Sequence, residues 1–207
     1  MAGLLPFNDT NYEKVKSTQY HASMKSHAVF GSLHGPTMIE RFDVHRAPSF
    51  KTKMNEVKSN DTTTQGQTYS EFDKLEVTVG SIDIGAHLVG NDGIVHGGII
   101  SMLFDEMFGW GCHDVMNYTS ITKDFVDPIV VTANLSVDFR APLPVSSSVV
   151  IRIYCEKISG KKLFLKATMQ NQKGTILYSE AKSLFIIVDK HKLNRKTTHS
   201  NTISSEK

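Results

Sequence analysis

The sequence has 207 residues and a formal net charge of +2, so it is long enough for one domain whose core needs no disulfide bonds. Residues 189–207 hold five basic and two acidic side chains, which leaves the remainder nearly neutral and excludes the broad basic surface of a nucleic-acid-binding protein. Cys112 and Cys155 are the only cysteines, and two isolated thiols provide neither a disulfide framework nor a metal site, which favours the reducing interior of a cell.

Residues 1–35 are expected to form an N-terminal arm that packs on the domain. Thr10 or Asn11 can cap a helix over residues 10–30, in which apolar side chains recur at nearly helical spacing. The apolar stretch near the N-terminus is too short for a signal peptide, so an intracellular compartment, cytoplasmic or mitochondrial, is expected. The absence of an early arginine gives a mitochondrial transit peptide only weak support. No apolar run in the sequence approaches the ~20 residues that a membrane span needs.

The first strand of a sheet is expected at residues 38–44. Residues 51–70 are polar and rich in Asn, Ser and Thr, which indicates an exposed insertion. From Leu75 onward, apolar side chains at Val77 and Val79 alternate with polar ones, and this period of two predicts the next strand.

The most informative stretch is residues 93–106, which read GIVHGGIISMLFDE. Gly97 and Gly98 lack a Cβ, so the chain can turn sharply there, and the run behind them contains no helix breaker. We therefore expect a strand, a loop and a helix whose first backbone N–H groups have no partner. Such donors suit a carbonyl oxygen that gains negative charge, as happens in acyl transfer. Asp105 lies about two turns along this helix.

Four further strands are expected after the helix, joined to it by a link at residues 113–128. In residues 131–140 the odd-numbered side chains are expected on one face, and the even-numbered ones, including Thr132 and Asn134, on the other. The last strand carries a row of small residues where a helix could lie close: Ser179, Ala181 and Ser183. Residues 189–207 are basic and rich in Ser and Thr, and we expect a disordered tail there.

The spacing of the central residues resembles a known family. His96, two glycines, and an aspartate nine positions after the histidine are similar to the signature of hotdog-fold acyl-coenzyme A thioesterases. The glycine-punctuated approach at residues 85–95 looks like that of superfamily members acting on fatty acyl-CoA. Residues 132–144 and 177–186 look like the later strands of the same group, and the resemblance covers about residues 75–188.

The resemblance implies an α+β hotdog fold, with a long central helix wrapped by an antiparallel sheet, over a domain at residues 36–188. The implied reaction is hydrolysis of acyl-CoA thioesters, with medium to long fatty acyl chains, to a free acid and coenzyme A. Coenzyme A is part of that substrate, and no separate cofactor is expected. In hotdog proteins the helix start of one protomer meets the aspartate of another, which implies a homodimer or a dimer of dimers. The alternative is a catalytically idle hotdog protein that binds acyl-CoA or a protein partner.

Five residues are candidates for catalysis. The amides of Gly97 and Gly98 would polarise the thioester carbonyl, and His96 would fix their turn. Asp105 would activate water or attack the carbonyl itself, unless it is an ordinary exposed carboxylate. The resemblance implies that the Thr132 hydroxyl orients the attacking water across from the aspartate; otherwise it is an ordinary strand residue.

Four further residues are candidates for substrate binding. Asn134 is expected on the same strand face as the candidate threonine. Arg140, Lys161 and Lys162 could hold the phosphates of coenzyme A, because Arg offers a bidentate fork and Lys a point charge. They could equally be solvated charges at strand ends.

Glu106 competes with Asp105 for the catalytic role, because some hotdog enzymes use a glutamate. One position along a helix turns a side chain by about 100°, so Glu106 is expected at a dimer contact or in solvent. A metal site is not expected at His96, since His113 and Asp114 stand a helix length away.

Overall fold

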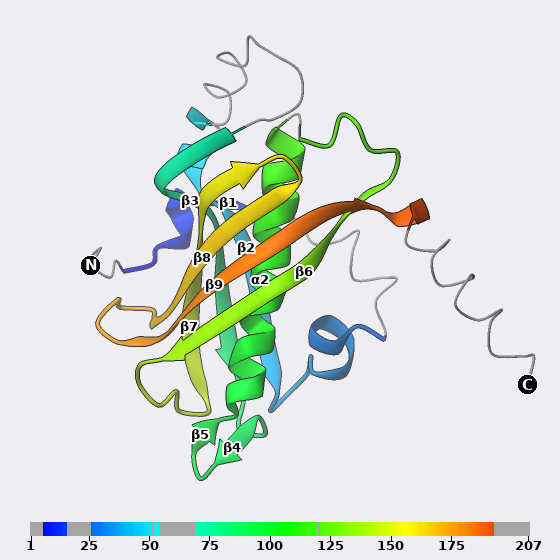
Figure 1. The fold of residues 1–207 in the computed structure, drawn as a ribbon. Coiled ribbons are helices and arrows are strands. Elements are labelled where there is room, and N and C mark those ends of the chain that lie inside the picture. Colours follow the sequence, from blue (N-terminus) through cyan, green and yellow to red (C-terminus); the bar gives the residue numbers. More distant parts are fainter. Residues whose placement is uncertain (1–5, 16–25, 51, 54–68, 120, 193–207) are drawn as a thin grey trace, which may run out of the picture.

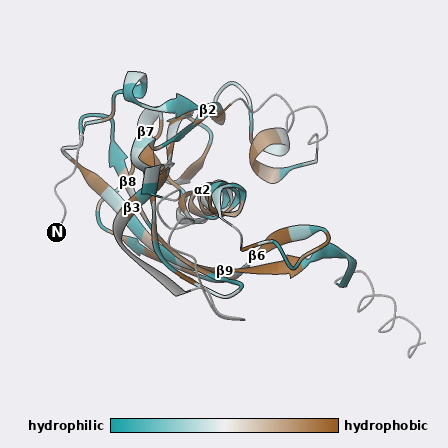
Figure 2. Cartoon of the chain, turned by 90° about the horizontal axis from the view of Figure 1, so that it is seen from above, coloured by the Kyte–Doolittle hydropathy of each residue, from teal (hydrophilic) through white to brown (hydrophobic). Residues whose placement is uncertain are grey.

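The computed structural model describes residues 6–15, 26–50, 52–53, 69–119 and 121–192. In this part of the chain one antiparallel sheet of seven strands curves around a long helix, α2, at Gly97–Tyr118 (Figure 1). Seen from above, in Figure 2, the sheet surrounds α2 only partly and leaves one side of it open. This arrangement agrees with the expected α+β hotdog fold.

The strands lie in the order β1-β2-β3-β7-β8-β9-β6, and each neighbouring pair is antiparallel. Two short strands, β4 and β5, form a separate hairpin just before α2. The strands are β1 Glu13–Lys14, β2 Ile39–Arg46, β3 Tyr69–Ile84, β4 Val89–Asn91, β5 Ile94–Val95, β6 Pro128–Phe139, β7 Ser147–Ser159, β8 Lys162–Asn171 and β9 Leu177–Asp189. Among the described strands, β6 therefore forms one edge of the sheet.

The core lies between α2 and the concave face of the sheet. Four large side chains of α2 are fully buried there: Leu103, Phe104, Met107 and Phe108. The helix approaches the sheet closely, because a Cβ on Gly111 would lie 2.8 Å from Cγ2 of Ile153. The expected row of small residues in β9 is buried as well: Ser179, Ala181 and Ser183.

Helix α2 runs on to Tyr118, so residues 113–118, which were expected to belong to the link at 113–128, are helical. Contacts with segments distant in sequence hold these last turns. The Tyr118 ring packs against the Phe50 ring at 5.6 Å between centroids, and the guanidinium carbon of Arg46 lies 5.0 Å from the centre of the Tyr118 ring. The hydroxyl of Thr119 then donates to the Val115 carbonyl and ends the helix.

The expected helix over residues 10–30 is wrong at its start. Asp9–Asn11 form one 3-10 turn, η1, and the next residues form strand β1, which pairs with β2. The Tyr12 hydroxyl donates to Glu76 on β3 at 3.0 Å, and such tertiary contacts favour the extended chain over a helix. Ala28–Ser32 form a single π-helical turn, η3, on the open side of α2 (Figures 1 and 2). Residues 16–25 lie outside the described part.

The remaining expected segments agree with the structure only in part. The first strand, expected at residues 38–44, is β2. The polar insertion expected at residues 51–70 lies mostly outside the described residues, and its last two residues, 69–70, begin β3. Asp189, expected in the tail, is buried at the end of β9, while residues 193–207 lie outside the described part. No helix among the described residues is long and apolar enough to cross a membrane.

Candidate active site

Asp105 on α2 and Thr132 on β6 meet at the edge of the sheet. The Thr132 hydroxyl donates a 2.8 Å hydrogen bond to Oδ1 of Asp105. Thr132 is exposed and Asp105 is half-buried, so the pair faces the surroundings rather than the core. This contact joins two residues that were candidates from the sequence, and their catalytic roles stay predictions.

A β-bulge aims Thr132 at the helix. Thr132 pairs with Phe185 of β9 and Asn134 pairs with Leu184, so Ala133 is an extra residue between two consecutive pairs. Phe185 is buried on the helix side, and the residue next to it in the strand faces away. Thr132 therefore lies on the helix side and Asn134 on the outer face.

The expectation that Thr132 and Asn134 share a face is thus wrong. In a regular strand, successive side chains alternate between the two faces of the sheet. One extra residue shifts this alternation, so each later side chain lies on the opposite face from the one expected. Beyond the bulge the odd-numbered residues Leu135, Val137 and Phe139 do face α2, as expected, because they pair with the inward row of β9. The structure does not bring Asn134 to Asp105.

His96 caps the first turn of α2. Its Nδ1 accepts a 2.9 Å hydrogen bond from the amide of Gly98, so the Gly98 amide is already engaged. The expectation that both glycine amides polarise a carbonyl is therefore wrong for Gly98. In the described part of the chain the Gly97 amide has no acceptor, and it is the donor that remains for a ligand. A Cβ on Gly98 would lie 2.9 Å from Nδ1 of His96, which explains the glycine.

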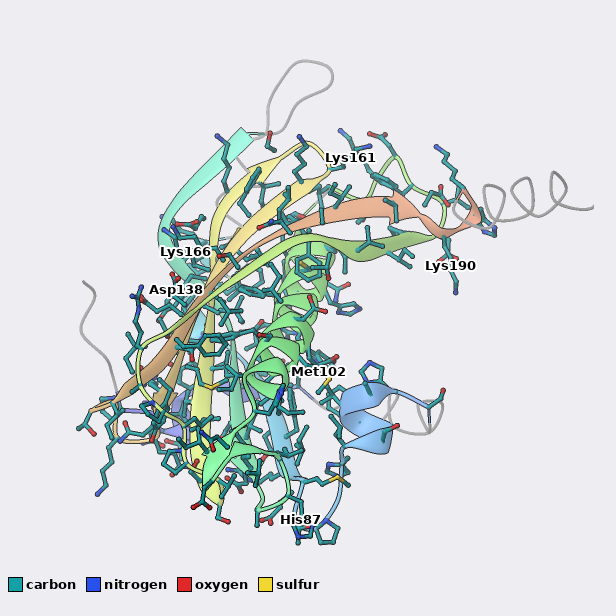
Figure 3. All side chains as sticks on the ribbon, turned by 60° about the horizontal axis from the view of Figure 1, so that its bottom comes forward. His87, Met102, Asp138, Lys161, Lys166 and Lys190 are labelled. Atoms are coloured by element: carbon teal, nitrogen blue, oxygen red, sulfur yellow. The ribbon has the colours of Figure 1, made fainter. Side chains whose placement is uncertain are left out.

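The candidate cations are far apart within one chain. Arg140 donates to Glu180 at 2.8 Å and lies 3.5 Å from Asp138, and it is about half exposed. It stands eight positions from Thr132 along the β6 direction, about 27 Å at 3.4 Å per residue. Lys161 and Lys162 are exposed at the opposite end, as the separation of the Asp138 and Lys161 labels in Figure 3 also shows.

Glu106 is only partly exposed, so a position in solvent is wrong, while the alternative of a dimer contact stays a prediction. Its side chain is 19% exposed, and Oε2 lies 3.5 Å from Nε2 of His27, which comes from the N-terminal arm. Burial raises the pKa of the Glu106 carboxyl, while the charge of His27 opposes the rise. Sequence alone gave no signal for this contact, because His27 is 79 positions away from Glu106.

The two cysteines cannot supply a nucleophile. Both are free and buried. Burial raises the pKa of the Cys155 thiol to about 12 and that of Cys112 well above its usual value, so neither is a thiolate at neutral pH. Neither cysteine therefore competes with Asp105, whose role as a base or a nucleophile stays a prediction.

Comparison with known proteins shows which family this chain is similar to. Residues 92–178 match the family model of the Thioesterase superfamily. Acyl-coenzyme A thioesterase THEM4 of Rattus norvegicus is 37% identical over 108 residues, which cover 52% of this chain and 42% of that protein. THEM4 of Mus musculus is 35% identical over 122 residues, which cover 58% of this chain and 48% of that protein. The chain thus spans less than half the length of these curated relatives.

A more distant relative and a solved structure are also similar to this chain. Acyl-coenzyme A thioesterase THEM5 of Homo sapiens is 26% identical over 102 residues, covering 49% of this chain and 37% of that protein. The PaaI protein of E. coli, from the phenylacetic acid degradation operon, superposes with a TM-score of 0.47 at 14% identity, over 67% of this chain and 96% of that one. Residues 92–178 are thus similar to the Thioesterase superfamily, and the strand order around α2 agrees with the hotdog fold.

Proposed function

We propose that this chain hydrolyses acyl-CoA thioesters to a free acid and coenzyme A. The observation that carries the proposal is the Thr132–Asp105 hydrogen bond at the open edge of the sheet. Thr132 occupies one carboxylate oxygen of Asp105 and leaves the other with lone pairs that can take a proton from water or attack the carbonyl carbon. Coenzyme A is part of the substrate, and the scheme needs no separate cofactor.

The Gly97 amide is the proposed donor to the thioester oxygen. Negative charge develops on this oxygen in the tetrahedral intermediate, and a backbone N–H at a helix start stabilises it. His96 holds the turn through the Gly98 amide and so sets the direction of the Gly97 N–H. The relatives from rat and mouse are named acyl-CoA thioesterases, which supports the same reaction here.

Removal of the Thr132 hydroxyl is expected to slow turnover. Thr132→Val should lower kcat by about tenfold, because a hydrogen bond to a charged group contributes ~1.5–3 kcal/mol and water replaces part of it. Thr132→Ser keeps the hydroxyl and is the matched control, expected to stay within threefold of the wild type. Steady-state release of coenzyme A measures both. Equal rates for the valine and serine variants would remove Thr132 from the mechanism.

We further propose that the working unit is a homodimer or a dimer of dimers. Gly97 and Asp105 are eight residues apart on one helix, about 12 Å at 1.5 Å per residue, so they cannot both touch one thioester carbonyl. A second copy can bring its own helix start to Asp105, and the β6 edge is available for pairing in the described part of the chain.

Sedimentation at micromolar concentration tests this assembly. A fully active monomer would contradict it. Mixing inactive Asp105→Asn protomers with inactive His96→Ala protomers should restore part of the activity, because a mixed dimer contains one site with both halves intact. No recovery after subunits have exchanged would place both halves of the site in one chain.

Medium to long fatty acyl chains are the proposed substrates, and an acyl-CoA series from C4 to C18 with an aryl-CoA alongside tests this. Release of coenzyme A, followed with a chromogenic thiol reagent, should rise from the short to the medium chains. A maximum at the shortest or at the aryl substrate would refute the chain-length proposal but not the reaction. An intracellular compartment, cytoplasmic or mitochondrial, remains a prediction from the sequence.

A further inference from the structure

A cavity of about 350 Å³ lies between α2, the start of β6 and the arm residue His27. This volume falls at the lower end of the ~300–1,000 Å³ range of small-ligand pockets, so it suits part of an acyl group and not a whole acyl-CoA. Its apolar lining includes Trp110, Met116 and Val130, and its polar lining consists of Glu106, His27 and His113.

The cavity lies directly beside the Asp105–Thr132 pair. Gly109 lines it and follows Asp105 by four residues, which places it on the same helix face about 6 Å further along. Val130 lines it from β6 and precedes Thr132 by two residues, about 7 Å along the strand. An acyl group whose carbonyl lies at Asp105 can therefore extend into the cavity.

The polar side of the cavity is held in place by the arm. The imidazole of His27 caps η3, because its Nδ1 accepts from the Phe30 amide at 3.4 Å, and this leaves Nε2 facing Glu106 at 3.5 Å. Phe30 anchors the turn by packing edge-on against Trp110, with ring centroids 6.3 Å apart. Figure 3 shows Met102, one turn before Glu106, on this same side of α2 facing η3.

A carboxylate in this position disfavours a fully apolar tail. A hydrocarbon chain that displaced water from Glu106 would leave some acceptor positions of the carboxylate without a donor, which costs free energy. A carboxylate has about four acceptor positions, so Glu106 can accept one more donor besides His27. A hydroxyl group on the acyl chain supplies that donor.

We infer that this cavity receives the distal part of the acyl group, and that Glu106, positioned by His27, selects acyl chains carrying a hydroxyl group. This inference rests on the proposed thioesterase function. Glu106 then acts in substrate choice and takes no part in the chemical step, which stays with Asp105.

Matched pairs of acyl-CoAs test the inference with the full chain. The pairs are unsubstituted and ω-hydroxy acyl-CoAs of four to ten carbons, and the readout is the ratio of kcat/KM within each pair. The wild type should favour the hydroxylated member of at least one pair by about tenfold, the size of one hydrogen bond to a charged group. Glu106→Met, which keeps the length of the side chain but removes its acceptors, should abolish or reverse that preference.

Three variants separate selection from folding. Glu106→Gln retains an acceptor oxygen and should keep part of the preference, and His27→Gln should reduce it by loosening Glu106. Glu40→Met, on the exposed side of β2, should keep the wild-type ratio. If Glu106→Met still hydrolyses acyl-CoAs and its ratio of kcat/KM within each pair equals that of the wild type, the inference is overturned. The proposed thioesterase function would not be affected by that result. No hydrolysis of either series by the wild type would instead overturn the proposed function.

Discussion

Asp105→Asn is expected to lower kcat for acyl-CoA hydrolysis by ~10²-fold or more, the usual contribution of a general base. An amide can still accept the hydrogen bond from Thr132, so the local geometry should survive. It cannot take a proton from water, and it cannot attack a carbonyl carbon. The loss should therefore appear in kcat, with KM little changed, when coenzyme A release is followed over a range of substrate concentrations.

Asp124→Asn provides the matched control for this substitution. Asp124 is exposed in the segment that follows α2, and the same change of charge there should leave kcat within twofold of the wild type. If Asp105→Asn also stays within twofold for every accepted acyl-CoA, Asp105 is neither base nor nucleophile.

Asp114→Ala is expected to lower the free energy of unfolding by about 3–5 kcal/mol, the usual cost of removing one partner of a buried ion pair. Asp114 is 4% exposed and accepts from Nε and Nη2 of Arg46 at 3.0 and 2.6 Å. Its other oxygen accepts from the Thr78 hydroxyl at 2.9 Å. Alanine would leave the guanidinium, whose side chain is 13% exposed, without its main counter-charge.

Urea unfolding measures this effect. The midpoint should fall with an unchanged slope, which indicates a loss of stability and not a change in the surface exposed on unfolding. Asp124→Ala, at an exposed position, is the control and should shift stability by no more than about 0.5 kcal/mol. If Asp114→Ala lowers the free energy of unfolding by less than about 1 kcal/mol, Asp114 is not the main counter-charge of Arg46. Glu13, which lies 3.3 Å from Arg46, and solvent would then balance the charge of the guanidinium.

The features that sequence predicted correctly are local ones. The helix follows from a run without a breaker. Gly97 and Gly98, expected to form a sharp turn before it, are its first two residues. The alternating burial along β8 follows from a period of two in a regular strand. In β3 an irregularity between Glu76 and Thr78 interrupts the expected alternation, and Thr78 is buried as well. The position of Asp105 on that helix was fixed by counting residues.

The features that sequence missed depend on contacts between distant segments. The bulge at Ala133 appears only when β6 is paired with β9, and it decides that Thr132 faces the helix while Asn134 does not. The strand at Glu13–Lys14 exists because β2 offers a free edge to pair with. The burial of Glu106 depends on His27, which approaches it from the arm.

Turnover and binding measured on the same two proteins decide between an enzyme and a binding protein. A panel of acyl-CoAs is offered to the wild type and to Asp105→Asn, with coenzyme A release followed in one experiment and binding by calorimetry in the other. We expect the wild type to bind and hydrolyse an acyl-CoA, and Asp105→Asn to bind it with similar affinity but to hydrolyse it at least ~10²-fold more slowly. Tight binding by the wild type without hydrolysis above background would exclude the proposed reaction and establish a catalytically idle hotdog protein.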